Sequence, residues 1–209
     1  MKGLQVFNDT NSLQISTDFI DMAFTGSRQV NNTDARSTAP FYAVIGTSKT
    51  GFISPTNPRL RNASGSGTVY DFTLDYLDHT EKDRLGLELY GADGKVYYNS
   101  NYKSISVLDR IILNPTRYSP VTPTLRSFYT KNYGSKKVAI LLIRDMAHFY
   151  FNQGNRTNLI FTAAFMQEDN GTLNVRSIPT EEIYTGGDPT STPSDSNYLE
   201  FLVIDVTNY

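Results

Sequence analysis

The most constraining feature of the sequence is a series of short segments in which apolar and polar residues alternate, separated by Gly, Pro, Asn and Asp. A period of two is the pattern of a half-buried β-strand. No stretch of twelve or more residues has convincing helical periodicity, and residues 76–86 have room for one short helical turn at most. We therefore expect an all-β fold, a β-sandwich or a related barrel, with little or no helix.

A β-hairpin is predicted at the start of the chain, where residues 3–7 and 13–16 flank a polar turn. The same pattern returns at 86–100, in which Asp93-Gly94 is a strong tight-turn pair. When the two segments are aligned at a spacing of 83 residues, so that Gly3 matches Gly86, apolar residues match apolar ones and polar residues match polar ones through both strands. This predicts a duplicated hairpin, although period-two patterning alone makes any two amphipathic hairpins similar.

Further strands are predicted from alternation or from continuous apolar character. The 138–143 segment is unbroken aliphatic sequence, which is typical of a strand covered on both faces. Asn170-Gly171 predicts a tight turn between two of the others. The remaining predicted strands are 41–46, 68–76, 104–113, 158–167, 171–177 and 198–206, with loops at 62–67 and 186–197.

The length of 209 residues permits more than one domain organisation. A single β-rich domain over 1–209 is one option. Two β halves, 1–115 and 125–209, are the other, because the segment between them carries three prolines and suits a linker or an extended crossover.

Charge and composition exclude several classes of function. Lys and Arg total 19 against 21 Asp and Glu, and they are scattered, so no nucleic-acid partner is expected. The absence of Cys excludes disulfides and thiolate metal sites. No apolar run is long enough to cross a bilayer, and residues 1–10 lack the pattern of a secretory signal. We expect the protein to be made in a cytoplasm, unless the sequence is a processed form. We do not expect it to insert into a membrane.

The search for catalytic chemistry predicts no catalytic, cofactor-binding or metal-binding residue. His79 is expected in a solvated turn and His148 in a packing role among aromatics. The carboxylates of Glu181-Glu182 and of Asp71 with Asp75 are expected to be solvated or at a strand edge rather than paired across a sugar cleft. Nucleophile-elbow, phosphate-loop and zinc-helix motifs are absent from the sequence.

Four tyrosines carry one sharper hypothesis about binding. Tyr97, Tyr98, Tyr102 and Tyr118 could offer flat aromatic faces to sugar rings. The alternative is that each ring is half-buried with its hydroxyl at the surface, as is usual for Tyr in β proteins. Trp, the commonest sugar platform, is absent.

The opening residues 3–8, with the second strand at 13–17, resemble a family of small tail proteins from tailed phages of Gram-negative bacteria. Members begin with a Tyr-Gly-Leu-Gln-Val-Tyr-like strand, a short turn and a second strand. Residues 86–100 are similar to the same element, and 198–209 to the closing strand of such proteins. Lys2 stands where the family has an aromatic residue. The resemblance implies a virion structural role near the tail tip or fibres, without catalysis.

The resemblance also implies partners. We expect contacts with other phage tail proteins and with copies of the same chain, with a trimer favoured by analogy to tail-tip symmetry. The expected location is the virion tail, after synthesis in the bacterial host cytoplasm. A glycan- or receptor-binding β-sandwich module is the alternative function, and it overlaps with the first if the protein contacts the host surface. An enzyme such as a depolymerase ranks third.

Overall fold

The structure is a computed structural model. It describes residues 5–7, 13–16, 22–31, 37–46, 66–74, 86–113, 127–145, 148–152, 157–184 and 198–209, and side chains at 22–30, 37–46, 66–74, 86–113, 129–145, 163–176 and 198–209. The described residues contain fourteen strands and no helix, so the expected all-β class is confirmed.

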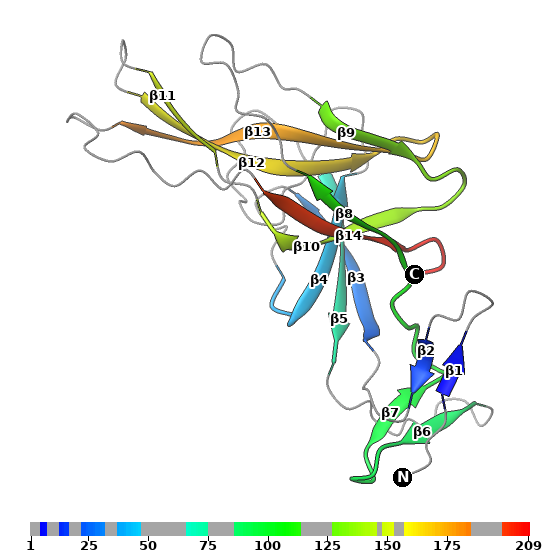
Figure 1. Cartoon of the computed structure of the whole chain (residues 1–209). Coiled ribbons are helices and arrows are strands. Elements are labelled where there is room, and N and C mark those ends of the chain that lie inside the picture. The colour runs from blue at the N-terminus through cyan, green and yellow to red at the C-terminus, as the bar shows by residue number, and fades with distance from the viewer. Residues whose placement is uncertain are drawn as a thin grey trace.

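Ten of these strands form one sheet, and the other four form two hairpins, β1–β2 and β6–β7 (Figure 1). The bounds are β1 Gln5–Phe7, β2 Leu13–Ser16, β3 Ala23–Asn31, β4 Phe41–Gly46, β5 Ser66–Thr73, β6 Glu88–Tyr90, β7 Val96–Asn99, β8 Val107–Leu113, β9 Ser127–Asn132, β10 Val138–Arg144, β11 His148–Asn152, β12 Thr157–Gln167, β13 Thr172–Tyr184 and β14 Leu199–Asp205.

Six strands of the large sheet curl into a barrel-like body. Their order is β8-β14-β10-β4-β5-β3, and every neighbouring pair is antiparallel. β3 and the segment just before β8 meet at an antiparallel bridge between Ala23 and Ser104. The Phe24 N–H donates to the carbonyl of Lys103 at 2.8 Å and the Ile105 N–H to that of Met22 at 3.0 Å. The barrel alternative among the two expected architectures thus describes this body best.

The core of this body is aliphatic and aromatic, with side chains from both ends of the chain. Phe72, Ile140 and Ile204 are fully buried in one cluster. Tyr209 packs against the Phe24 ring in an edge-to-face arrangement with centroids 4.9 Å apart. Such burial is the main stabilising contribution available to a chain without disulfides.

A second layer covers part of the barrel. It consists of β12, β13 and β9, with β11 paired to β12, and it joins the barrel sheet through a parallel bridge between Met166 and Gly46. Phe201 of β14 connects the layers, because its ring contacts those of Phe165 and Tyr129 at centroid distances of 5.2 and 6.0 Å. β11, β12 and β13 extend together beyond the barrel (Figure 1).

The two hairpins are equivalent in bounds, register and irregularity, which confirms the predicted duplication. Adding 83 to the numbers of β1 and β2 gives the bounds of β6 and β7. Val6 pairs with Ile15, and Leu89 with Tyr98, at corresponding positions. Each hairpin then has one extra residue in its second strand, Gln14 in one and Tyr97 in the other. β2 and β7 contact each other, so the hairpins lie side by side (Figure 1).

The equivalence continues into the strands that follow each hairpin. β3 corresponds to β8 at the same spacing, and both have a bulge at the same place. Thr25 is the extra residue in β3, between Phe24 and Gly26, and Leu108 is the extra residue in β8. Because bulges are placed features that bend a strand, a shared one indicates a shared building plan.

The rest of the barrel completes an approximate two-fold relation. β3 pairs with β5 and β5 with β4, just as β8 pairs with β14 and β14 with β10. The β4–β10 pair lies at the centre, where Val44 is opposite Ile140. Continuing that antiparallel register places Ala43 opposite Leu141, its own counterpart in the other copy. The barrel therefore consists of two similar halves, and β9 and β11–β13 are additions to the second.

Each predicted strand has an observed counterpart, with differences at the ends, whereas β3, β9 and β11 were not predicted. Residues 66 and 67, expected in a loop, belong to β5, and β13 continues well past 177 through Pro179. The 138–143 segment was expected to be covered on both faces. It is covered only at its start, since Val138 is fully buried but Ile143 is half exposed. Strands from 1–115 and 125–209 share one sheet.

Candidate functional site

A polar cleft with a volume of about 520 Å³ opens at one end of the central β4–β10 pair. Its floor is apolar and includes Ile45, Val138 and Val206. Its walls come from β3 and β5 on one side and from the β9–β10 and β12–β13 turns on the other. The polar lining residues are Ser27, Gln29, Thr68, Tyr70, Ser135, Lys136, Lys137, Gln167, Glu168, Asp169 and Tyr209.

The two turns that form one wall are packed backbone against backbone. Gly134 and Gly171 both have positive φ, at 66° and 85°. A Cβ atom on Gly171 would collide with the carbonyl of Gly134, so only glycine fits there. The Tyr133 N–H donates to the carbonyl of Gly171 at 3.0 Å. The turns thus hold each other in one arrangement.

Side-chain amides fix this wall further. The Gln167 side chain accepts a hydrogen bond from the Val138 N–H at 2.8 Å and donates to the Lys136 and Gly171 carbonyls at 2.7 and 3.2 Å. Asn132 donates to the Asn170 carbonyl at 3.1 Å. These bonds satisfy turn carbonyls that no strand ladder serves, which makes the wall a rigid frame.

The opposite wall is a hydrogen-bonded row on β3 and β5. The Gln29 amide donates to the Thr68 hydroxyl at 2.9 Å. Burial raises the pKa of the Tyr70 hydroxyl, and a hydrogen bond with Thr68 opposes that rise without cancelling it. Tyr70 therefore remains a neutral phenol, able to donate and to accept.

Charged residues of both signs stand at the cleft. Lys136 is paired with Asp205 at 2.5 Å. Burial works against ionisation of Asp205, but hydrogen bonds from Lys136 and Thr207 outweigh it and lower the pKa of this carboxyl. Lys137 and Asp169 are exposed, and within the part of the chain that the structure describes neither side chain has an ion-pair partner. These two groups are available to a ligand.

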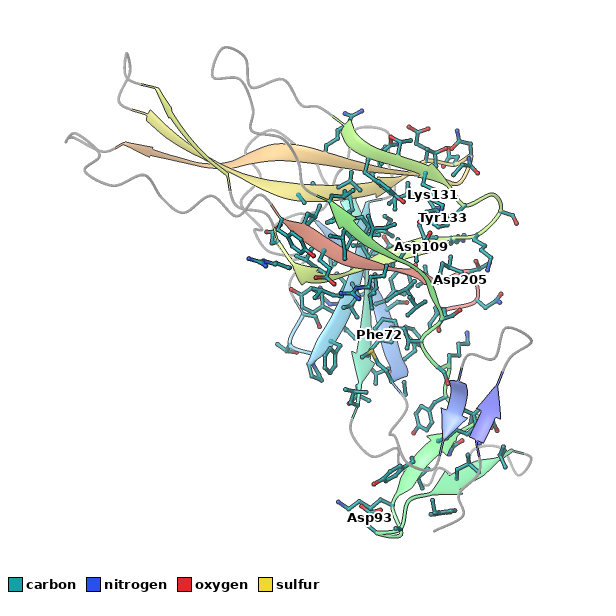
Figure 2. The ribbon with its side chains drawn as sticks, viewed as in Figure 1. Phe72, Asp93, Asp109, Lys131, Tyr133 and Asp205 are labelled. Carbon is teal, nitrogen blue, oxygen red and sulfur yellow. The ribbon has the colours of Figure 1, made fainter. Side chains whose placement is uncertain are left out.

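A second charged cluster anchors the β9 side of the wall to β8. Asp109 accepts hydrogen bonds from Lys131 at 2.7 Å and from the Tyr133 hydroxyl at 2.8 Å, and Figure 2 shows the three side chains together. The bond from Lys131 is the main reason that the pKa of Asp109 is lowered. Burial, with hydrogen bonding, raises the pKa of Tyr133 far above its usual value. This cluster has a structural role.

The tyrosines singled out from the sequence are not gathered in this cleft. Tyr97 is the bulge residue of β7 and its ring stands over Gly91. Tyr98 pairs with Leu89, and Tyr102 packs with Ala23 and Val96. All three tyrosines are half-buried. Tyr118 lies outside the described residues.

The structure locates some of the other residues that were considered for catalysis. His148 is in β11 and Glu181 and Glu182 are in β13, in parts of those strands where only the backbone is described. Asp71 accepts a 2.5 Å hydrogen bond from the Ser37 hydroxyl. His79 and Asp75 fall outside the described ranges, as does the whole of the proline-containing 114–124 segment.

The described residues contain no group of three or more His, Cys, Asp or Glu side chains placed to hold a metal ion. Nor do they contain a helix long and apolar enough to cross a membrane.

Sequence reasoning missed the cleft, because its lining comes from segments more than a hundred residues apart. The available signal was the pair of glycine turns at 133–137 and 168–171, which the sequence marks as turns but not as neighbours. Comparisons of the chain with family models, curated proteins and solved structures find no match.

Proposed function

We propose that the chain is a non-enzymatic structural protein of a bacteriophage tail, at the tip or associated with fibres, and is made in the cytoplasm of the bacterial host. The resemblance to tail proteins rests on the opening hairpin. The observation that carries the proposal is that this hairpin is a repeated unit, with the same bounds, register and bulge in β1–β2 and β6–β7. A motif used twice in one fold is an architectural element rather than a chance match.

The described ion pairs favour a structural role. Lys131–Asp109 joins β9 to β8, Arg110–Glu200 joins β8 to β14, and Lys136–Asp205 joins the β9–β10 turn to β14. Each pair connects elements of the fold to one another.

Self-association is part of the proposal, with a trimer as the favoured form. Val107 and Ile112 of β8 are each about half exposed, at 49% and 48%, and Ile143 of β10 is 51% exposed. Apolar side chains of this size gain free energy when a symmetric copy covers them. Light scattering of the purified protein should give a mass of three chains, and a mass of one chain at micromolar concentration would contradict this part.

The test of virion membership uses assembled particles. Phage particles produced by a host that carries an epitope-tagged copy of the gene are purified on a density gradient and analysed by mass spectrometry. We expect the chain in intact particles and in isolated tails, and labelled antibody at the distal tail end. Its absence from purified particles would eliminate the proposal.

A glycan- or receptor-binding module is the second candidate function. The polar cleft favours it, because a space of about 520 Å³ with a rigid wall has the size and preorganisation of a small-ligand site. The two functions are compatible in a tail-tip protein.

A further inference from the structure

We propose that the cleft between the β3–β5 row and the two glycine turns binds a neutral oligosaccharide. This goes beyond the structural role and deepens the second candidate function. It rests on the proposed function only for the source of the sugar, a host-surface glycan, and not for the binding itself.

The barrel architecture alone does not account for the polar lining of the cleft. A second depression, of about 260 Å³, lies at the opposite end of the same β4–β10 pair, where the two-fold relation places Pro40 at the position of Val138. Its lining is mainly apolar, with Phe41, Leu142 and Ile143, and Asp145 is its one charged residue. The two ends of the strand pair therefore differ in size and in chemistry, and charged residues of both signs line only the larger one.

The charges of the lining select against ionic ligands. Lys137 on one turn is balanced by Asp169 on the other, while Lys136 is paired with Asp205 and Glu168 accepts a hydrogen bond from Asn174. An anion would meet the Asp169 carboxylate and a cation the Lys137 ammonium group, so neither gains a site of one sign. A ligand without net charge avoids both costs.

Hydroxyl groups fit the donors and acceptors that remain. A sugar hydroxyl donates one hydrogen bond and accepts others, and it needs both kinds of partner. Lys137 supplies donors, Asp169 supplies acceptors, and the Gln29 amide and the Ser27 hydroxyl can do both.

The rigid wall lowers the cost of binding. The side chains at 135–137 and 168–169 project from turns held by Gly134, Gly171 and Gln167, so few backbone states are lost when a ligand binds. Preorganisation of this kind is a general source of affinity and specificity.

The experiment measures binding of defined probes to the full chain. The neutral probes are maltotriose, a galactose trisaccharide and the N-acetylglucosamine trisaccharide. Sialyllactose is the anionic probe and the glucosamine trisaccharide the cationic one. Saturation-transfer NMR detects binding and isothermal titration calorimetry gives affinities. We expect at least one neutral probe to bind, and more tightly than either charged probe.

Variants place the site. Lys137→Ala and Asp169→Asn should each weaken binding about tenfold, because the first removes a charged donor and the second replaces a charged acceptor with a neutral one. Lys95→Ala and Asp93→Asn are the matched controls, since these residues are exposed in the β6–β7 turn, where Figure 2 shows Asp93 far from the cleft. We expect the controls to stay within twofold of the unmodified chain.

Three results would overturn the inference. One is no binding of any neutral probe at millimolar concentration, and another is tighter binding of a charged probe. The third is a loss on Tyr98→Ala that equals or exceeds the loss in the cleft variants, which would move the site to the β6–β7 hairpin. Failure here leaves particle analysis unaffected, so the sugar site and the tail role are judged separately.

Discussion

The α-carbon of Gly171 faces the carbonyl of Gly134 so closely that no β-carbon can be accommodated between them. This contact joins the β9–β10 turn to the β12–β13 turn, and both residues have a left-handed backbone conformation. Two turns that lie apart in the sequence therefore meet through glycine alone, at the wall of the polar cleft.

Gly171→Ala should destabilise the protein by more than about 2 kcal/mol, because the left-handed conformation costs a residue with a β-carbon about 1–2 kcal/mol and the collision adds to it. Gly94→Ala is the matched control, since its φ is 77° and no atom lies within 4 Å of the added Cβ. It should cost only about 1 kcal/mol. Urea unfolding followed by fluorescence compares the two, and equal losses would show that the contact does not matter.

Stability should fall in acid because Asp109 and Asp205 have lowered pKa values in the folded chain. A carboxyl of this kind stabilises the fold above its unfolded pKa of about 3.9, and that contribution is lost as pH falls through the lower folded value. Asp109→Asn should therefore flatten the decline between about pH 5 and pH 2. At neutral pH we expect it to cost about 1 kcal/mol, a modest value because solvent screens the pair. Thermal unfolding across pH gives both quantities, and an unchanged profile would contradict the assignment.

Phe201→Ala should cost about 3–5 kcal/mol, because it opens a cavity where the barrel meets the second layer. Phe201 is fully buried and its ring contacts two others. Leu87→Ala is the control, because its side chain is 46% exposed and outside the barrel core, with an expected change within about 0.5 kcal/mol. If calorimetry finds similar losses, Phe201 does not join the layers as described.

Gly91→Ala should loosen the β6–β7 hairpin, since an added Cβ would run into the Tyr97 ring. Hydrogen exchange at the Ser100 amide, which donates to the Leu87 carbonyl at 2.9 Å, should accelerate. Combining Gly91→Ala with Tyr97→Ala should restore part of the protection, because the colliding ring is gone. Gly26→Ala, where nothing lies within 4 Å, should leave the exchange unchanged. Faster exchange in the double variant than in Gly91→Ala would refute the contact.

The elements that sequence could predict are those with strong local patterns. β10 is unbroken aliphatic sequence, and the β12–β13 turn has Asn170-Gly171. β3 was not predicted, because Gly26 and the polar residues 27–29 interrupt its alternation. The structure explains that composition, since Ser27 and Gln29 line the cleft and need not be apolar. The cleft itself depends on which turns meet in space, and local periodicity carries no information about that.

The hairpin duplication could be predicted because every matched position of the two hairpins, beginning with Gly3 and Gly86, is separated by the same 83 residues. The rest of the two-fold relation could not, since the additions to the second half change the spacing and leave few matching residues between β5 and β14. Register and bulge positions, rather than identity, preserve the relation.

The position of β14 has a consequence for folding during synthesis. β14 lies between β8 and β10 in the sheet, yet it follows every other described strand in the chain. The second half of the barrel therefore cannot close until residue 205 has left the ribosome. Before that point, β8 and β10 lack the strand that pairs with both, and open strand edges are sites of aggregation. A nascent chain that stalls short of Leu199 should accordingly depend on chaperones far more than one that stalls after Asp205.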